Sequence, residues 1–149
     1  MRYFDDFQVG EVHESGPHVV SKEEVLAFAR QFDPQPFHID EEAASRSIYG
    51  GIIASGWHTA SITHRLLVEG ILKDTASMGS PGLDELRWLK PVRPGDALTL
   101  RMEVVAVTPS RSKPDRGALK CRMEVRNQKG EVVMTELANA LFARRSPAQ

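Results

Sequence analysis

The segment SGWHTASITHRLLVEGIL, residues 55–72, predicts a long α-helix that begins at Ser55 or Gly56 and ends near Leu72. Its apolar side chains recur at helical spacing and are spread over more than one face. One face carries Trp57, Ala60, His64, Leu67 and Ile71, and another carries Ile62 and Leu66. A helix that is apolar around much of its circumference is typically covered by other structure. We therefore expect the rest of the chain to wrap around this helix.

The second half of the chain shows the two-residue period of half-buried β-strands. Alternating runs occupy residues 98–106 and 119–126, and residues 83–89 form a further strand. A hairpin connection at 127–130 leads into a last strand that is apolar on both faces near its end, so this strand is expected in mid-sheet or at an interface. The open edges of such a sheet favour association into a homodimer or a dimer of dimers.

The residues before the long helix predict a weak strand, near residues 12–20, and two short helices. Ser21 and Glu24 form a capping-box pattern at the start of the first helix. Pro34 ends that helix at Asp33, because the residue before a proline is pushed out of the helical region. The helix carries one apolar stripe: Val25, Phe28, Ala29 and Phe32. Asp40 begins the second helix, and the whole order of elements indicates one α+β domain over residues 1–149.

The composition is that of an ordinary globular protein, with 149 residues, 41% hydrophobic residues, 26% charged residues and a net charge of −1. This balance does not favour nucleic acid or a membrane surface as a partner. The acidic N-terminal segment is not a signal peptide, and no hydrophobic run approaches the roughly 20 residues of a membrane helix. We therefore expect a cytoplasmic protein. The single cysteine, Cys121, excludes an internal disulfide and falls on the apolar face of its strand, where an inert core thiol is expected.

The loop FDPQPFHID, residues 32–40, holds an acid and an imidazole between prolines. Asp33 and His38 are suited to act as a general acid–base pair that adds water to a double bond conjugated to a carbonyl. In the expected reaction His38 takes the proton from water and Asp33 delivers one to the α-carbon, or the two roles are exchanged. Backbone N–H groups at the start of the long helix could hold the enolate oxygen, because helix N-termini favour negative charge. Spacing alone also allows a turn residue at Asp33 and a structural, buried His38.

The same residues resemble a known family. The loop residues Asp33, Pro36, His38 and Asp40, with the segment 53–56 (Ile-Ala-Ser-Gly), resemble the D-x-N-P-x-H…I-x-H-G signature of the MaoC-like (R)-specific enoyl-CoA hydratases. Residues 89–96 also resemble that group's turn between strands, so the resemblance covers nearly the whole chain. It implies a dimeric hot-dog fold, in which an antiparallel sheet wraps a long central helix. It also implies that Asp33 and His38 are the catalytic pair and that the Gly56 amide is the oxyanion donor.

Two positions depart from that signature. Gln35 stands where the family has asparagine, and Ser55 stands where it has histidine. Gln35 is one methylene longer, so the hydrogen bond that orients the site is expected to be displaced, while Ser55 is expected to cap the helix. Both are candidate substrate contacts. Trp57 either lines the acyl pocket or is buried at the start of the core helix.

The loop of residues 109–117 is rich in cations. Its Arg111, Lys113 and Arg116 either bind the phosphates of coenzyme A or belong to a solvated loop. His58 and His64 lie six residues apart, which is not the spacing of a helical metal pair, and no Cys, His and carboxylate cluster supports a metal site. No metal, redox nucleotide or prosthetic group is expected.

The expected activity is therefore the addition of water to, or its removal from, an acyl thioester of coenzyme A. Two other functions stay open. A hot-dog thioesterase would release free thiol, whereas a non-catalytic acyl-thioester-binding protein, which the departures at Gln35 and Ser55 make plausible, would bind without turnover. The acyl chain length and the physiological direction depend on the packing of the pocket and are not predicted from the sequence.

Overall fold

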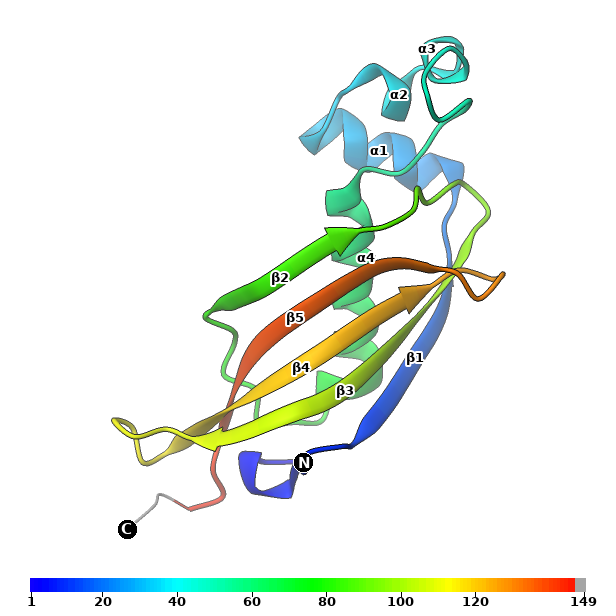
Figure 1. Cartoon of the computed structure of the whole chain (residues 1–149). Helices are drawn as coiled ribbons and strands as arrows, with labels where there is room; N and C mark the ends of the chain where they lie inside the picture. Colours follow the sequence, from blue (N-terminus) through cyan, green and yellow to red (C-terminus); the bar gives the residue numbers. More distant parts are fainter. Residues whose placement is uncertain (147–149) are drawn as a thin grey trace.

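The computed structural model describes residues 1–146 and contains a five-stranded antiparallel sheet that curves around one long helix (Figure 1). The strands lie in the order β1-β3-β4-β5-β2. Their bounds are Val12–Val19 for β1, Gly82–Trp88 for β2, Ala97–Pro109 for β3, Arg116–Arg126 for β4 and Val132–Ala143 for β5. Strands β3, β4 and β5 form a meander, β1 pairs with β3, and β2 pairs with β5 at the other edge. This arrangement is the α+β hot-dog fold expected from the sequence.

The central helix α4 spans Gly56–Leu67 and continues as a π-helical turn over Val68–Leu72, so the helical segment ends where expected. On one side of α4 the side chains of Ile62, Thr63 and Leu66 are buried. The other side is exposed in the single chain and includes Trp57, which is 58% exposed, and His64. The expectation that other structure covers most of this helix is confirmed, because the exposed residues of α4 are limited to one stripe of Trp57, Ser61, His64 and Arg65.

The inner face of the sheet consists of alternating residues of β3 and β4, as their two-residue period predicts. The buried side chains are Leu98, Leu100, Met102 and Val104 on β3 and Leu119, Cys121, Met123 and Val125 on β4. Burial of one such side chain stabilises the fold by about 1.5–3 kcal/mol relative to leaving it exposed. The layer between α4 and the sheet is thus the core, and it fixes the position at which α4 begins.

Three short helices lie beyond the end of the sheet where α4 begins (Figure 1). Helix α1 spans Lys22–Phe32, and the predicted capping box is confirmed: Ser21 Oγ accepts the Glu24 N–H, and the Glu24 carboxylate accepts the Ser21 N–H, each at 3.1 Å. Helix α3 spans Glu41–Ser45, and its N-cap is Asp40, as expected. A 3-10 turn, η1, covers Phe4–Asp6 at the other end of the molecule.

The loop between α1 and α3 differs from the prediction in two respects. It contains a further helix, α2, over Pro36–Ile39, with Pro36 in the first turn. Proline fits this position, because the first N–H groups of a helix have no hydrogen-bond partner within the helix. Phe32 was expected on the buried stripe of α1 but is 65% exposed, because it is the last residue of the helix. Of this stripe, Val25 and Ala29 are fully buried.

Strand β5 lies inside the sheet, between β4 and β2, which confirms the mid-sheet position expected from its two apolar faces. Strand β2 is an edge strand. All of its residues except Leu86 are exposed in the single chain, including Leu83 and Trp88.

Candidate active site

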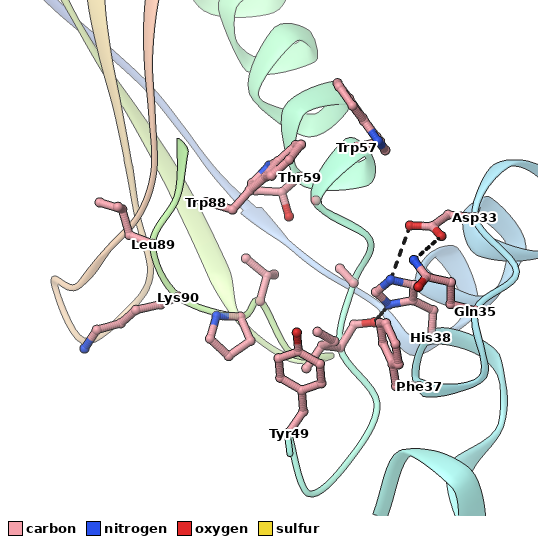
Figure 2. Close-up of a pocket in the computed structure, with 15 residues that line it drawn as sticks. Asp33, Gln35, Phe37, His38, Tyr49, Trp57, Thr59, Trp88, Leu89 and Lys90 are labelled. Atoms are coloured by element: carbon pink, nitrogen blue, oxygen red, sulfur yellow. Dashed lines mark hydrogen bonds and ion pairs between the residues drawn. The ribbon is translucent and has the colours of Figure 1, made fainter. Parts of the chain in front are cut away.

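The end of α1 and the start of α2 bring Asp33 and His38 together. Asp33 is the C-cap of α1, and His38 lies in the short helix that Pro36 begins. The distance between Asp33 Oδ2 and His38 Nε2 is 3.3 Å, and Figure 2 shows the two side chains facing each other at one side of a cavity. The prolines of this loop therefore fix the spacing of an acid and an imidazole.

Asp33 is held by two further donors, and both come from the positions that depart from the family signature. Ser55 Oγ donates a hydrogen bond of 2.7 Å to Asp33 Oδ2, and Gln35 Nε2 donates one of 2.7 Å to Oδ1. Partial burial raises the pKa of Asp33, but the hydrogen bonds from Ser55 and Gln35 and the neighbouring His38 outweigh it, so that the pKa lies below its ordinary value. Asp33 is an ionised carboxylate at neutral pH.

The backbone fixes the tautomer of His38. The imidazole is 3% exposed, and its Nδ1 lies 2.7 Å from the carbonyl oxygen of Ile53. A carbonyl can only accept, so Nδ1 carries a hydrogen and Nε2 is the atom that faces Asp33. An Nε2 lone pair would repel the ionised carboxylate, whereas an Nε2–H is attracted to it. With Nδ1–H donated to the Ile53 carbonyl, Nε2 is the ring nitrogen placed to exchange a proton with Asp33 Oδ2.

Ser55 connects this pair to α4. Its side chain is fully buried, and its Oγ accepts the Trp57 N–H at 3.2 Å, so it is the helix cap that the sequence predicts as well as a donor to Asp33. The N–H of Gly56, the residue between Ser55 and Trp57, makes no hydrogen bond within residues 1–146. A free N–H in the first turn of a helix is a favourable position for a negatively charged oxygen.

These groups surround a cavity of about 440 Å³. Asp33, His38, Gly56 and Thr59 form its polar side. Apolar and aromatic side chains form most of the remaining wall: Phe37, Tyr49, Ile53, Ala54, Trp57, Trp88, Leu89, Pro91 and Val92. A mostly apolar pocket with a few convergent polar groups is the usual form of a small-molecule site.

Residues 6–126 match the family model described as MaoC like domain, which covers well over half of the chain. The chain belongs to the MaoC-like domain family. The match contains Asp33, His38, Ser55 and Gly56, and therefore every group that has just been described around the acid–imidazole pair.

This MaoC-like domain is similar to other proteins in sequence and in structure. It is 37% identical to an uncharacterised protein of Bacillus subtilis, over 84% of this chain and 87% of that protein. It is 30% identical to the 3-hydroxybutyryl-CoA dehydratase of Methylorubrum extorquens, over 83% of this chain and 74% of that enzyme. The crystal structure of the MaoC-like dehydratase from Rhodospirillum rubrum superposes with a TM-score of 0.90 at 46% identity, covering 98% of this chain and 99% of that one. The (R)-hydratase from A. caviae involved in PHA biosynthesis superposes with a TM-score of 0.75 at 26% identity, covering 93% and 98%.

The structure places the remaining candidate residues of this MaoC-like domain in two groups. Trp57 lines the cavity and is largely exposed, so the alternative of a buried core tryptophan is wrong. Arg111, Lys113 and Arg116 do not line the cavity of their own chain. They lie around the β3–β4 connection, at the end of the sheet opposite α1–α3 (Figure 1), where Arg116 pairs with Asp115 at 2.8 Å. Their predicted contact with the phosphates of coenzyme A stays a prediction.

Sequence reasoning missed three aromatic residues of the wall: Phe37, within the loop motif, and Tyr49 and Trp88, outside any motif. Trp88 ends a strand whose pattern gave no indication of the cavity. Cys121 is buried as predicted, and burial raises the pKa of its thiol to about 11, which is typical of an unreactive core cysteine.

Residues 1–146 contain no cluster of three or more His, Cys, Asp and Glu side chains placed to hold a metal ion. Over the same residues, no helix has both the length and the apolar character needed to cross a membrane.

Proposed function

We propose that this MaoC-like domain is a hydratase or dehydratase that adds water to an enoyl thioester, or removes it from a 3-hydroxyacyl thioester, of coenzyme A. One observation carries the proposal: Asp33 and His38 Nε2 face each other at 3.3 Å beside a cavity that the unpaired Gly56 N–H also borders. The similarity to the 3-hydroxybutyryl-CoA dehydratase of Methylorubrum extorquens and to the (R)-hydratase from A. caviae supports the same reaction class.

We assign the two proton transfers from the contacts of Asp33 and His38. Ionised Asp33 can accept a proton from water as its oxygen bonds to the β-carbon of the enoyl group. His38 can donate the proton on Nε2 to the α-carbon. Of the two role assignments that the sequence leaves open, this one is favoured by the donors on Asp33, which stabilise its ionised form.

The contact between the two side chains also restores the starting state. After one turnover Asp33 holds the proton that came from water, and His38 Nε2 has lost its own. The 3.3 Å separation allows the proton to pass from Oδ2 to Nε2, which regenerates the carboxylate and returns a proton to Nε2. Dehydration runs the same steps in reverse.

The Gly56 N–H would hold the thioester oxygen. Negative charge develops on that oxygen as water adds to the β-carbon, so a fixed donor stabilises the transition state more than the ground state. The core layer beneath α4 fixes this donor before substrate binds.

We further propose that the working unit is a homodimer or a larger assembly. The edge strand β2 offers unpaired backbone groups, and both Trp88 at its end and Trp57 on the exposed side of α4 border the cavity. A second copy that covers this edge would also close the wall of the site.

A spectrophotometric screen of straight-chain enoyl-CoA thioesters, with thiol release followed in parallel, tests the proposal. Loss of the enoyl absorbance without free thiol is the expected result. Thiol release would assign a thioesterase instead, and saturable binding without either change would assign a non-catalytic acyl-thioester-binding protein.

A further inference from the structure

A second cluster of ionisable side chains lies outside the cavity, where α1 meets β1 and α4. Glu24, in the first turn of α1, faces two imidazoles with one carboxylate oxygen. Its Oε1 lies 2.9 Å from Nε2 of His18 on β1 and 3.2 Å from Nε2 of His58 on α4. Its Oε2 accepts both the N–H and the hydroxyl of Ser21, the cap of α1. One carboxylate therefore joins three elements of the fold.

Glu24 is the ionised member of this cluster. Partial burial raises the pKa of its carboxyl group, but the hydrogen bonds from His18 and Ser21 and the neighbouring His58 outweigh this effect, so the pKa lies below its ordinary value. The two imidazoles and the Ser21 N–H do not involve the Ser21 side chain, so a change of that side chain leaves Glu24 in place. Contacts on both oxygens fix the direction of the carboxylate as well as its position.

His58 is the buried member of the cluster. It is 6% exposed and does not line the cavity. Phe28, one turn after Glu24 on α1, stacks on its ring at a centroid distance of 4.8 Å and an interplanar angle of 10°. Burial lowers the pKa of His58 more than Glu24 raises it, so the imidazole is neutral at neutral pH. Because a carboxylate can only accept, the hydrogen of this ring belongs on Nε2, and the buried Nδ1 has no hydrogen-bond partner within residues 1–146.

The contacts between α1 and α4 lie toward both ends of α1. Near its start, Glu24 and Phe28 hold His58 in the first turn of α4. At its end, Asp33 accepts the hydroxyl of Ser55, the cap of α4, at 2.7 Å. Figure 1 shows α1 lying across the start of α4. Because α1 is one continuous helix, release of its start lets the helix turn about its other contact and moves the carboxylate at its end.

The imidazole of His38 is held separately from α1, because its Nδ1 lies 2.7 Å from the carbonyl oxygen of Ile53. A turn of α1 would therefore change the distance from Asp33 to His38 as well as the hydrogen bond from Ser55. Both contacts belong to the candidate active site, so the orientation of α1 determines the geometry of the acid.

We propose that the contact between His58 and Glu24 positions Asp33, by holding α1 against the first turn of α4. The carboxylate of Asp33 then stays within reach of Ser55 and His38. His58 is a positioning residue, because it does not border the cavity in which the substrate would lie. The expected effect on the rate rests on the proposed function, whereas the expected effect on the carboxylate of Asp33 does not.

Two amide variants of His58 test this role. The amide nitrogen of glutamine can take the place of Nε2 and reach Glu24, whereas that of asparagine takes the place of Nδ1 and falls short. His58→Asn should raise the pKa of Asp33 toward its ordinary value, because the Ser55 hydroxyl no longer meets the carboxylate in line. His58→Gln should keep the parental pKa. NMR titration of isotope-labelled aspartate carboxyl groups, with Asp33→Asn to assign the signal, measures the difference.

Enoyl-CoA hydration gives a second measurement. A displacement of about 1 Å can cost about 10²-fold in rate, so His58→Asn should lower kcat by about 10–10²-fold. KM should change little, because position 58 does not line the cavity, and His58→Gln should recover most of the parental kcat. Leu119→Val is the control for a general loss of stability, because it removes core volume near the start of β4, away from α1 (Figure 1). It should leave the pKa of Asp33 and kcat as in the parent.

The two measurements separate failure of the inference from failure of the proposed function. A rise in the pKa of Asp33 that is confined to His58→Asn supports the inference even if no enoyl thioester is hydrated. A parent that hydrates enoyl-CoA, with the pKa of Asp33 and kcat unchanged in His58→Asn, supports the function and overturns the inference. Equal changes in the asparagine and glutamine variants would also overturn it, because the ring and not its contact with Glu24 would then be responsible. His58→Leu, which buries no unpaired amide, replaces the asparagine variant if circular dichroism shows that variant to be unfolded.

Discussion

At the scale of single residues, the site depends on how Asp33 is held. Ser55 and Gln35, which differ from the residues of the family signature, both donate to its carboxylate, so the departures keep the acid in place instead of displacing it. Ser55 has two roles at once, because the same hydroxyl caps α4 and donates to Asp33. The charge state of the acid is thereby linked to the start of the central helix.

Ser55→Ala should raise the pKa of Asp33 toward its ordinary value, because one donor to the carboxylate is lost. If Asp33 acts as the base, the acid limb of the pH profile of kcat/KM should move to higher pH. The depressed pKa of Asp33 stabilises the fold above the unfolded-state pKa, and this contribution is lost as pH falls through the folded-state pKa. The stability difference between parent and variant should therefore be present at neutral pH and shrink in acid.

Ser21→Ala is the matched control, because Ser21 caps α1 without contacting Asp33. Loss of either cap should cost about 0.5–2 kcal/mol in the free energy of unfolding, measured by chemical denaturation. Only Ser55→Ala should shift the acid limb. An unchanged acid limb in Ser55→Ala would mean that Asp33 is not the group that titrates there.

At the scale of elements, the junction between α4 and β2 brings the first turn of the helix against an aromatic ring. Gly56→Ala should destabilise the protein by about 1–3 kcal/mol, because its methyl group would overlap Trp88. It should also lower kcat/KM by about 10²-fold if the clash moves the Gly56 N–H away from the thioester oxygen. Thermal melting and steady-state kinetics measure the two effects.

The double variant Gly56→Ala/Trp88→Ala separates packing from catalysis. Removal of the indole should recover most of the stability lost in Gly56→Ala, which would appear as a coupling energy between the two positions. Simple additivity of the two single variants would contradict the close fit between Gly56 and Trp88.

Much of the element order could be predicted because it depends on local sequence patterns. The capping box at Ser21 and Glu24, the stop before Pro34 and the alternation in β3 and β4 all depend on neighbours in sequence. Helix α2 was missed because Pro36 suggests an interruption, although proline suits a first helical turn. The exposure of Trp57 within the largely covered helix α4 could not be predicted, because apolar spacing cannot tell a surface covered by the same chain from one left for a ligand or a second copy.

The site was predictable only in part, for a related reason. Asp33, His38 and Gly56 belong to motifs that are short in sequence, and the structure brings them to one cavity. Trp88 and the bond from Ser55 to Asp33 depend on strands and helices that meet only in the folded chain. The cationic residues near the β3–β4 connection were candidates by charge alone, and charge does not specify which end of the sheet a loop occupies.

At the scale of the whole molecule, the uncovered edge of the sheet is the main feature that one chain leaves unexplained. Strand β2 has unpaired backbone groups along one side, and Leu83, Trp88 and Leu89 are exposed on or beside it. Edge strands of this kind readily pair with another chain. Light scattering at micromolar concentration should give about twice the 16.6 kDa mass of the chain, or a multiple of that dimer. A stable monomer would contradict both the interface and a site that the partner helps to close.

In the proposed reaction, Asp33 and His38 exchange protons with water and the α-carbon. The most direct measurement is the steady-state rate of enoyl-CoA hydration by Asp33→Asn and His38→Gln, beside the parent, with circular dichroism to check that each variant is folded. Loss of either proton-transferring group should lower kcat by about 10²–10⁴-fold. Hydration by either folded variant at close to the parental rate would contradict the account.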